Sequence, residues 1–294
     1  MVVKLELYRV FCEVAKQKSL SKAASSLYMT QPAVSQSIAQ LERELGLRLF
    51  TRTSKGVILT NEGKLLFEYA NSAINLINKG EEKLEEWKNL SAGELKIGVG
   101  DTISRYFLLP YLEKFHKLYS NIKLKIMNKT TLELCALVKS GEIDIAICNL
   151  PIEEPALEII KIMDIHDIFV CGNVYKEKLS SALSLKELSN LPLILLEPKS
   201  NSRRYVEKFF LSKGISIKPE IELGSHDLLL EFARINLGVS CVIREFSQEY
   251  LKKKELFEIK LNENIPERSI GICFLKSVSL SPTSERFVQI LGKS

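Results

Sequence analysis

The sequence predicts three parts in order: a small all-α module, one long helix, and an α/β body. Apolar residues recur at helical spacing through the first sixty residues, and the next thirty keep a helical period without proline. Beyond residue 91, short apolar runs alternate with amphipathic segments, which is typical of α/β architecture. A chain of 294 residues is long enough for more than one domain.

The composition describes a globular chain, with 46% hydrophobic and 26% charged residues. No stretch approaches the roughly 18 apolar residues of a membrane span, and the N-terminus lacks the order of a secretory signal. We therefore expect a cytoplasmic protein that has no membrane partner. Six cysteines and three histidines are dispersed without CxxC, HExxH or other metal-ligand spacing, so we expect buried thiols, no metal and no cofactor.

The net charge of +5 lies entirely in the first fifth of the chain. Residues 1–60 hold nine basic and four acidic side chains, and residues 61–294 hold 32 of each. A basic module on a neutral body is typical of a chain that meets a polyanion, because phosphate neutralisation supplies most non-specific affinity for nucleic acid. On charge alone, an ordinary basic solvated surface remains the alternative.

Two helices are predicted at the N-terminus. The first ends near Lys18, because four apolar residues fall at i, i+3, i+4 and i+7. These residues are Leu7, Val10, Phe11 and Val14. The second spans Ser21 to Tyr28 and is capped by Ser19 or Ser21, and its small alanines allow close packing against its neighbours.

A third helix begins after Thr30, which is a good N-cap, and it accepts Pro32 in its first turn. Its apolar stripe must face the other two helices and consists of Val34, Ile38, Leu41 and Leu45. The opposite face is small and amide-bearing, with Pro32, Ala33, Ser35, Gln36, Ala39 and Gln40. Glutamine can pair with adenine and alanine can contact a thymine methyl, so this face suits a recognition helix of a helix-turn-helix.

The run from Leu47 to Leu59 predicts a short hairpin with a basic tip, formed by Arg48, Arg52 and Lys55. Such a wing would lie against phosphates or in the minor groove. The alternative for the whole segment is a small helical module that binds another protein.

The string SLSKAASSLYMTQPAVSQSIAQLERELGLRLFTRTSKGVILTNEG resembles, without a gap, the winged helix-turn-helix of the LysR-type transcriptional regulators. The resemblance implies double-stranded promoter DNA as a partner, with RNA polymerase as a further candidate. It implies these DNA-contacting residues: Thr30, Gln31, Pro32, Ala33, Ser35, Gln36 and Arg52. Gln36 and Ser37 stand where many members have an arginine, which shifts the expected contacts toward adenine and DNA shape.

Residues 61–90 predict one helix, capped by Thr60, with a seam that repeats every three or four residues. The predicted seam consists of Leu66, Tyr69, Ala73, Leu76, Gly80, Leu84 and Trp87. In LysR-like proteins the corresponding helix pairs two chains, so the resemblance implies a homodimer or homotetramer. A helix that packs only on its own domain is the alternative.

The body, residues 91–294, alternates predicted strands with helices. Strands are expected at 94–99, 122–127, 143–148, 168–171, 193–196, 220–223, 239–243 and 270–275, and helices at 103–118, 132–139 and 282–291. GELKIGV, SGEIDIAI and ILLEPKSNSRR resemble the effector domain of the same regulators, which has the two-lobed fold of type 2 periplasmic binding proteins. By this resemblance lobe one takes residues 91–163 and 267–294, and lobe two takes 164–266.

Ligands of α/β folds settle beyond the carboxyl ends of strands, where helices begin. The polar residues expected there line the predicted effector crevice: Gly100, Asp101, Thr102, Thr130, Thr131, Asn149, Ser200, Asn201, Ser202, Arg203, Ser225 and His226. The alternative for Thr131, Ser202 and Ser225 is an ordinary N-cap.

These side chains predict the chemistry of a small-molecule effector. Hydroxyls at helix N-termini favour a carboxylate, whereas Asp101 favours an amine, so a carboxylate or a zwitterionic metabolite is expected. His226 is predicted to make binding depend on pH near neutrality.

Sequence motifs of enzymes fail in this chain. The segment Gly98–Asp101 begins like a dinucleotide loop, but Ile103 stands where the third glycine is needed, and neither GxSxG nor a Walker loop occurs. We therefore predict a ligand-responsive DNA-binding regulator in which a metabolite closes the crevice and respaces the reading heads. The alternative is a ligand-binding protein or enzyme of the same fold without sequence-specific DNA binding.

Overall fold

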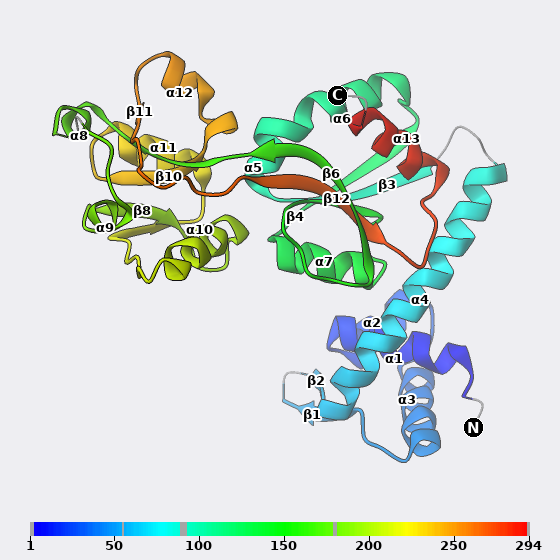
Figure 1. Cartoon of the computed structure of the whole chain (residues 1–294). Helices are drawn as coiled ribbons and strands as arrows, with labels where there is room; N and C mark the ends of the chain where they lie inside the picture. The colour runs from blue at the N-terminus through cyan, green and yellow to red at the C-terminus, as the bar shows by residue number, and fades with distance from the viewer. Residues whose placement is uncertain (1–2, 55, 89–92, 179–180, 293–294) are drawn as a thin grey trace. The chain divides into compact units, whose positions relative to one another are not determined.

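The computed structural model describes residues 3–54, 56–88, 93–178 and 181–292 (Figure 1). Its contacts divide the chain into two units, the first built on Met1–Asn89 and the second on Leu90–Val138 and Ile143–Ser294. Each unit is described by itself. Among the described residues, none of the helices combines the length and the hydropathy that crossing a membrane requires.

The first unit contains three short helices, a hairpin and a long helix, as the sequence predicts. In order these are α1 (Leu5–Gln17), α2 (Leu20–Ser26), α3 (Gln31–Leu45), β1 (Phe50–Thr53), β2 (Gly56–Leu59) and α4 (Asn61–Lys88). The predicted caps Ser19 and Thr30 accept hydrogen bonds from the backbone N–H groups of Lys22 and Ala33. The predicted tip residue Lys55 lies outside the described residues.

The predicted end of the second helix is wrong. Helix α2 ends at Ser26 rather than Tyr28, because the backbone turns at Leu27 and Tyr28 has a left-handed φ of 54°. Thr60 caps α4 as expected, since its Oγ1 accepts a hydrogen bond from the N–H of Gly63 at 3.0 Å. The core stripes of α1 and α3 are confirmed, with Leu45 only partly buried.

Helix α4 has one side that packs on the core of the first unit and another side that is exposed; of the predicted seam, Tyr69, Ala73, Gly80 and Leu84 are exposed. Leu66, Ala70 and Ile74 belong to the hydrophobic core of the first unit, because residues spaced by four lie on the same side of a helix. The prediction is therefore wrong at Leu66, and Leu76 is half-buried. The large apolar side chains that stay exposed on α4 are Leu65, Tyr69, Ile77 and Leu84. The side chain of Trp87 lies outside the described residues.

The second unit contains two five-stranded sheets, and the first of them forms lobe one. Its strand order is β4-β3-β5-β12-β6; β3 pairs in parallel with β4 and β5, and β12 runs antiparallel to β5 and β6. Its elements are β3 (Gly93–Val99), α5 (Asp101–Ile103), a π-helical turn (Ser104–Leu108), α6 (Leu109–Leu118), β4 (Ile122–Asn128), α7 (Thr131–Lys139), β5 (Ile145–Asn149), β6 (Leu157–Ile165), β12 (Arg268–Leu275) and α13 (Pro282–Leu291).

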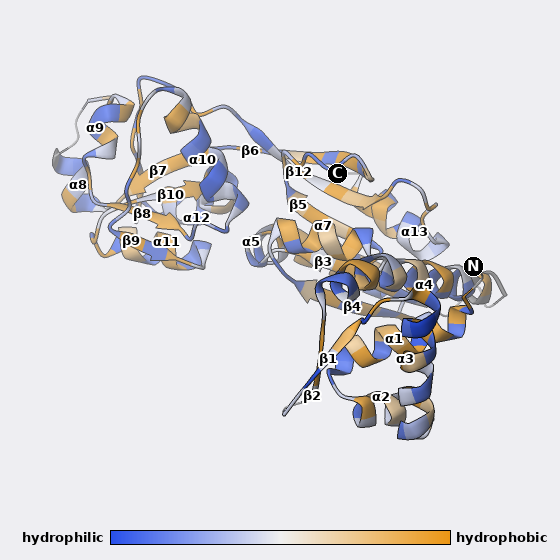
Figure 2. Ribbon diagram, turned by 90° about the horizontal axis from the view of Figure 1, so that it is seen from below, coloured by the Kyte–Doolittle hydropathy of each residue, from blue (hydrophilic) through white to orange (hydrophobic). Residues whose placement is uncertain are grey.

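The second sheet forms lobe two, with the order β11-β7-β10-β8-β9. Strands β8, β9 and β10 run parallel within it, and β7 is antiparallel to β10 and β11. Its elements are β7 (Asp167–Cys171), α8 (Asn173–Lys178), α9 (Leu185–Ser189), β8 (Leu193–Leu196), α10 (Asn201–Ser212), β9 (Ile221–Leu223), α11 (His226–Arg234), β10 (Val239–Ile243), a 3₁₀ turn (Arg244–Phe246), α12 (Gln248–Lys252) and β11 (Phe257–Glu258). Figure 2 shows that strands β7, β8 and β10 are largely hydrophobic.

The chain passes between the lobes twice. It leaves lobe one from β6 into β7 through His166, and it returns from Glu267 into β12. Strand β6 was not predicted, because Glu158, Lys161 and Asp164 interrupt its apolar residues and it forms an edge of its sheet. The two-residue strand β11 was also not predicted.

Candidate functional site

Helix α3 presents the small, amide-bearing face that its sequence predicts. Gln31, Pro32 and Gln36 are exposed, and Ala33 and Ser35 are half-buried. Val34, Ile38 and Leu41 face inward and are at most 7% exposed. The exposed face therefore begins at the capped N-terminus of the helix, where backbone N–H groups lack intrahelical partners.

Glu42, the first carboxylate along α3, is already used within the fold. Glu42 Oε1 accepts hydrogen bonds from the backbone N–H groups of Leu49 at 2.7 Å and Phe50 at 3.2 Å. These bonds tie the end of α3 to the start of the hairpin. A carboxylate that is bound in this way does not project toward a polyanion.

The hairpin is anchored to the helices beside it. The N–H of Val57 donates to the carbonyl of Lys18 at 3.1 Å, where α1 ends. Gly56 has a φ of 130°, and a Cβ there would lie 2.3 Å from the same carbonyl oxygen. Arg52 lies on β1 and is exposed, so a cation projects from an anchored strand.

Tyr28 is a residue of this surface that the sequence reasoning missed. It directly precedes Met29 and Thr30 in the turn between α2 and α3, and its side chain is 99% exposed. A positive φ is uncommon for a large aromatic residue such as Tyr28. The signal in the sequence was weak, because helical periodicity also placed Tyr28 in the preceding helix.

A cavity of about 310 Å³ lies between the lobes of the second unit and is lined by both. It lies beyond the carboxyl ends of strands, as α/β sheets predict. The structure brings eleven of the predicted crevice residues to its lining: Gly100, Asp101, Thr102, Thr130, Thr131, Asn149, Ser200, Asn201, Ser202, Arg203 and His226. Ser225 is not part of the lining.

The alternative interpretation of three of these residues as N-caps is wrong in detail. Thr130, rather than Thr131, caps α7, since its Oγ1 lies 3.5 Å from the N–H of Glu133 and donates to the carboxylate of Glu133. The Oγ of Ser200, rather than that of Ser202, accepts from the N–H of Arg203. Each helix begins one or two residues from the predicted position. Ser225 occupies the N-cap position of α11, but its side chain makes no capping bond.

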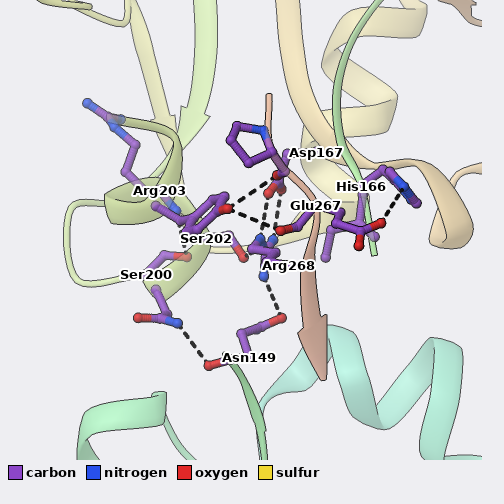
Figure 3. A network of polar contacts seen from close by, with 12 residues as sticks. Asn149, His166, Asp167, Ser200, Ser202, Arg203, Glu267 and Arg268 are labelled. Atoms are coloured by element: carbon purple, nitrogen blue, oxygen red, sulfur yellow. Dashed lines mark hydrogen bonds and ion pairs between the residues drawn. The ribbon is translucent and has the colours of Figure 1, made fainter. Parts of the chain in front are cut away.

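A buried guanidinium joins the two lobes beside the cavity (Figure 3). Arg268 Nε and Nη2 donate to the carboxylate of Asp167 at 2.5 and 2.8 Å. Nη1 donates to the side chain of Asn149 at 2.8 Å, and Nη2 also donates to Ser202 Oγ at 2.9 Å. Asn201 adds a bond from its Nδ2 to the carbonyl of Asn149. The side chain of Arg268 thus contacts residues of both lobes, at the place where both crossovers run.

Sequence reasoning missed Asp167 and Arg268. Each is the first residue of a largely apolar strand, β7 or β12, and the two are 101 residues apart. A charged residue at the start of a buried strand was a signal for a buried pair, but nothing in the sequence specified its partner.

Arg203 was expected to contact an effector, but the two terminal nitrogens of its guanidinium are engaged within lobe two. Nη2 lies 2.6 Å from Glu207, and Nη1 donates to the carbonyl of Leu196 at 3.0 Å and to Glu222 at 3.4 Å. The side chain points away from the network around Arg268 (Figure 3). These contacts fold α10 onto β8 and β9, so its charge is neutralised within lobe two.

The predicted titration of His226 near neutrality is wrong. The side chain is buried, and desolvation lowers its pKa from 6.5 to about 4. Its Nε2 accepts a hydrogen bond from the backbone N–H of Ile243 at 3.1 Å, which requires an unprotonated nitrogen. At neutral pH the imidazole is uncharged, and its proton is on Nδ1.

The remaining charges of the cavity lie in exposed positions. Asp101, Glu133 and Glu197 supply carboxylates, and Lys129 supplies an ammonium group. Asp101 accepts a long hydrogen bond of 3.4 Å from Asn128. Hydrogen bonds from the Thr130 side chain and backbone lower the pKa of Glu133. Lys129 and Glu197 were not predicted to line the crevice.

A metal-binding group of three or more His, Cys, Asp or Glu side chains is not found within the described ranges. The cysteines that the structure describes are free thiols, and five of the six are buried. Burial raises the pKa of Cys12 to about 12 and that of Cys171 to about 11. A raised pKa disfavours the thiolate that metal binding and nucleophilic chemistry need.

Known proteins resemble this chain along its whole length. The family model for the LysR substrate binding domain matches residues 88–294, and that for the bacterial regulatory helix-turn-helix of the lysR family matches residues 5–64. The RuBisCO operon transcriptional regulator of Allochromatium vinosum is 28% identical over 287 residues, which cover 98% of this chain and 95% of the relative. CysL of Bacillus subtilis is 25% identical over 286 residues, which cover 97% and 96%.

Solved structures share the fold. The structure of CbnR, described as a LysR family transcriptional regulator, has a TM-score of 0.65 at 18% identity and covers 99% of both chains. A full-length variant of OxyR from Pseudomonas aeruginosa has a TM-score of 0.72 at 20% identity and covers 100% of this chain and 94% of that one. With the helix-turn-helix at one end and the two-lobed domain at the other, the chain belongs to the LysR family of transcriptional regulators, which join a DNA-binding domain to an effector-binding domain.

Proposed function

We propose that this regulator reads promoter DNA through one contiguous surface, formed by the exposed face of α3 and the wing. The observation that carries the proposal is the exposed start of α3, which has no free carboxylate and lies in the same unit as the exposed Arg52. In this proposal Gln36 contacts base edges, and the small side chains of Pro32, Ala33 and Ser35 also contact base edges. Thr30, Gln31 and Arg52 contact the phosphate backbone.

Tyr28 joins this surface as a backbone contact. Its hydroxyl projects from the turn that precedes the recognition helix, and hydroxyl groups commonly bond phosphate oxygens. Contact with phosphates carries no sequence information directly. Its role is therefore to set the position of α3 on the duplex.

Helix α4 is proposed to pair two copies of the chain. Leu65, Tyr69 and Leu84 are 60%, 72% and 64% exposed, which is unusual for large apolar side chains spaced along one helix. Pairing would bury them and present two reading heads to two half-sites. Leu84→Glu should shift the chain toward monomer in sedimentation, whereas Glu81→Gln on the same helix should not.

The crevice between the lobes is proposed to bind a small molecule that changes promoter binding, and RNA polymerase is proposed as the partner that responds at the promoter. The hydrogen bonds of Arg268 and Asn201 connect the two lobes and so help to set the angle between them. A ligand that binds between the lobes would act on this angle. A ligand can shift this equilibrium only by its differential affinity for the two arrangements.

Reciprocal binding tests this coupling. A panel of carboxylates and amino acids is screened by thermal shift on the full chain, and operator affinity is measured with each compound that binds. The factor by which a compound changes DNA affinity must equal the factor by which DNA changes the affinity for that compound. A compound that binds in the crevice with the same affinity whether or not operator is bound would contradict the coupling.

A further inference from the structure

Two buried hydrogen-bond donors beside the crevice have no partner. They are Nδ1 of His226 and Nε of Arg203, and both residues line the cavity. His226 is 3% exposed and Arg203 is 5% exposed. Native proteins pair nearly all buried polar groups, so two unpaired donors at one cavity indicate a missing acceptor.

The tautomer of His226 follows from its surroundings. Because Nε2 accepts the hydrogen bond from Ile243, the single proton of the neutral ring is on Nδ1. Burial lowers the pKa of the ring to about 4, so this state holds throughout the neutral range. Nδ1 therefore offers an N–H donor and cannot accept a hydrogen bond.

The protein holds this donor in place. The imidazole contacts the ring of Tyr106 with centroids 5.5 Å apart and the ring of Phe246 with centroids 6.4 Å apart. The hydroxyl of Tyr106 is itself bound to the carboxylate of Asp227, so the ring beside His226 is also fixed. Rotation of the imidazole would break the bond to Ile243.

Arg203 is held in a similar way. Its two terminal nitrogens are engaged by Glu207, Glu222 and the carbonyl of Leu196, which leaves Nε as the donor without a partner. Both residues follow the carboxyl ends of strands: Arg203 follows β8 on α10, and His226 follows β9 on α11. Strands β8 and β9 are neighbours in the sheet, so the two donors belong to the same wall of lobe two.

We propose that this wall binds an oxyanion of the effector, a carboxylate or phosphate oxygen, through the donors His226 Nδ1–H and Arg203 Nε–H. The inference rests on the proposed function of the crevice and specifies the chemical class of its ligand. Donors without acceptors select an oxygen and cannot bind an ammonium group. An amine of the same ligand would instead lie at one of the exposed carboxylates of the cavity, Asp101 of lobe one or Glu197 of lobe two.

The test uses the full chain with ¹⁵N-labelled histidine and three probes at equal ionic strength: sodium acetate, inorganic phosphate and methylammonium chloride. The chain has three histidines, so His226 is assigned by substitution. We expect acetate or phosphate, but not methylammonium, to shift the Nδ1–H resonance of His226 in a saturable way. Whichever of acetate and phosphate shifts this resonance at the lower concentration indicates whether the ligand carries a carboxylate or a phosphate.

Two matched variants separate the donor from the fold. His226→Gln places Oε1 where Nε2 accepts from Ile243 and removes the donor, whereas His226→Asn keeps a nitrogen donor near the position of Nδ1. We expect about tenfold weaker oxyanion binding in His226→Gln and a smaller loss in His226→Asn. Arg203→Lys, which keeps the charge beside Glu207 but lacks Nε, should also weaken binding.

The inference is overturned if His226→Gln binds acetate and phosphate as tightly as the unaltered chain, or if only methylammonium shifts the resonance. It is also overturned if no probe shifts it at saturating concentration. Selective operator binding by the unaltered chain is measured in parallel. If that binding persists while the oxyanion result fails, the ligand class is wrong and the regulator stands; if operator selectivity itself fails, the proposed function is wrong.

Discussion

The DNA-binding face and the effector crevice are built in different ways. The residues of the reading face on α3 lie within one stretch from Thr30 to Gln36, and the helical period alone decides which of them point outward. The crevice is instead lined by residues spread along the chain from Gly100 to Ile243, which belong to two lobes with one sheet each. The chain passes between these lobes twice. Local spacing specifies the first surface, whereas long-range pairing specifies the second, so single substitutions should affect them differently.

The largest effect should follow from breaking the buried pair that joins the lobes. The side chains of Arg268 and Asp167 are 1% and 2% exposed, so Asp167→Asn leaves a buried charge without its partner. We expect about 3–5 kcal/mol less stability in urea unfolding of the second unit. The helix-turn-helix of this variant should stay folded, because α3 lies in the other unit.

An exposed ion pair within lobe two supplies the control. Lys253 and Glu249 are 58% and 74% exposed, so Glu249→Gln should change the stability by less than about 1 kcal/mol. Equal losses from Asp167→Asn and Glu249→Gln would show that the buried pair does not hold the lobes.

The next effect is a pH dependence that arises in the second unit, which contains all three histidines. The pKa of His226 is about 4 in the folded chain, against an ordinary value of 6.5. As the pH falls, His226 is therefore protonated in the unfolded chain before it is protonated in the folded chain. His226 therefore contributes its full stability above pH 6.5. Between 6.5 and 4 this contribution should decline by about 1.4 kcal/mol per pH unit.

Urea unfolding at a series of pH values checks this slope. His226→Gln should flatten it, because glutamine does not titrate. A slope in His226→Gln that equals that of the unaltered chain would assign the pH dependence to other groups.

Substitutions on the reading face should alter recognition while leaving the fold intact. Gln36→Ala should weaken binding to the specific site by about 1–3 kcal/mol and leave binding to random duplex unchanged. Arg52→Ala should weaken binding to all sequences and reduce the salt dependence by about one unit of slope. Fluorescence anisotropy on both duplexes distinguishes these outcomes. Equal losses on both duplexes from Gln36→Ala, or a loss confined to the specific site from Arg52→Ala, would contradict the assigned roles.

The smallest predicted difference concerns two glycines at the ends of the recognition segment. Gly46 has a φ of 69° with open space around its Cβ position, so Gly46→Ala should cost about 1 kcal/mol of stability. Gly56→Ala adds a clash with the Lys18 carbonyl at 2.3 Å and should cost more, about 1–3 kcal/mol. Thermal unfolding of the two variants checks this order. If Gly46→Ala were the more destabilising, the anchoring of the wing at Lys18 would be wrong.

The sequence predicted most of the DNA-binding unit because its contacts are local. Val34, Ile38 and Leu41 repeat at the spacing that buries one helix face, and Thr30 caps the helix within three residues. The failures there had local causes as well. Tyr28 keeps the helical pattern although its backbone leaves the helix, and Leu66 was assigned to the seam although it packs against the core.

The crevice was less predictable because burial and pairing decide its chemistry. Polar residues after strands indicated the place, and their convergence follows from the sheet. Glu207 follows Arg203 at the i,i+4 spacing of a helical ion pair, but the sequence carried no signal that Glu222 would join it or that burial would keep His226 uncharged. Such properties depend on neighbours that only the folded chain brings together.

A salt series of DNA binding tests the central claim most directly. The full chain is titrated onto the DNA upstream of its own gene and onto random duplex of equal length. The account predicts binding to the upstream DNA that is about a thousandfold tighter or more at physiological salt, with a log–log salt slope of several units. Equal affinity for both duplexes, or no binding to either at moderate salt, would contradict it.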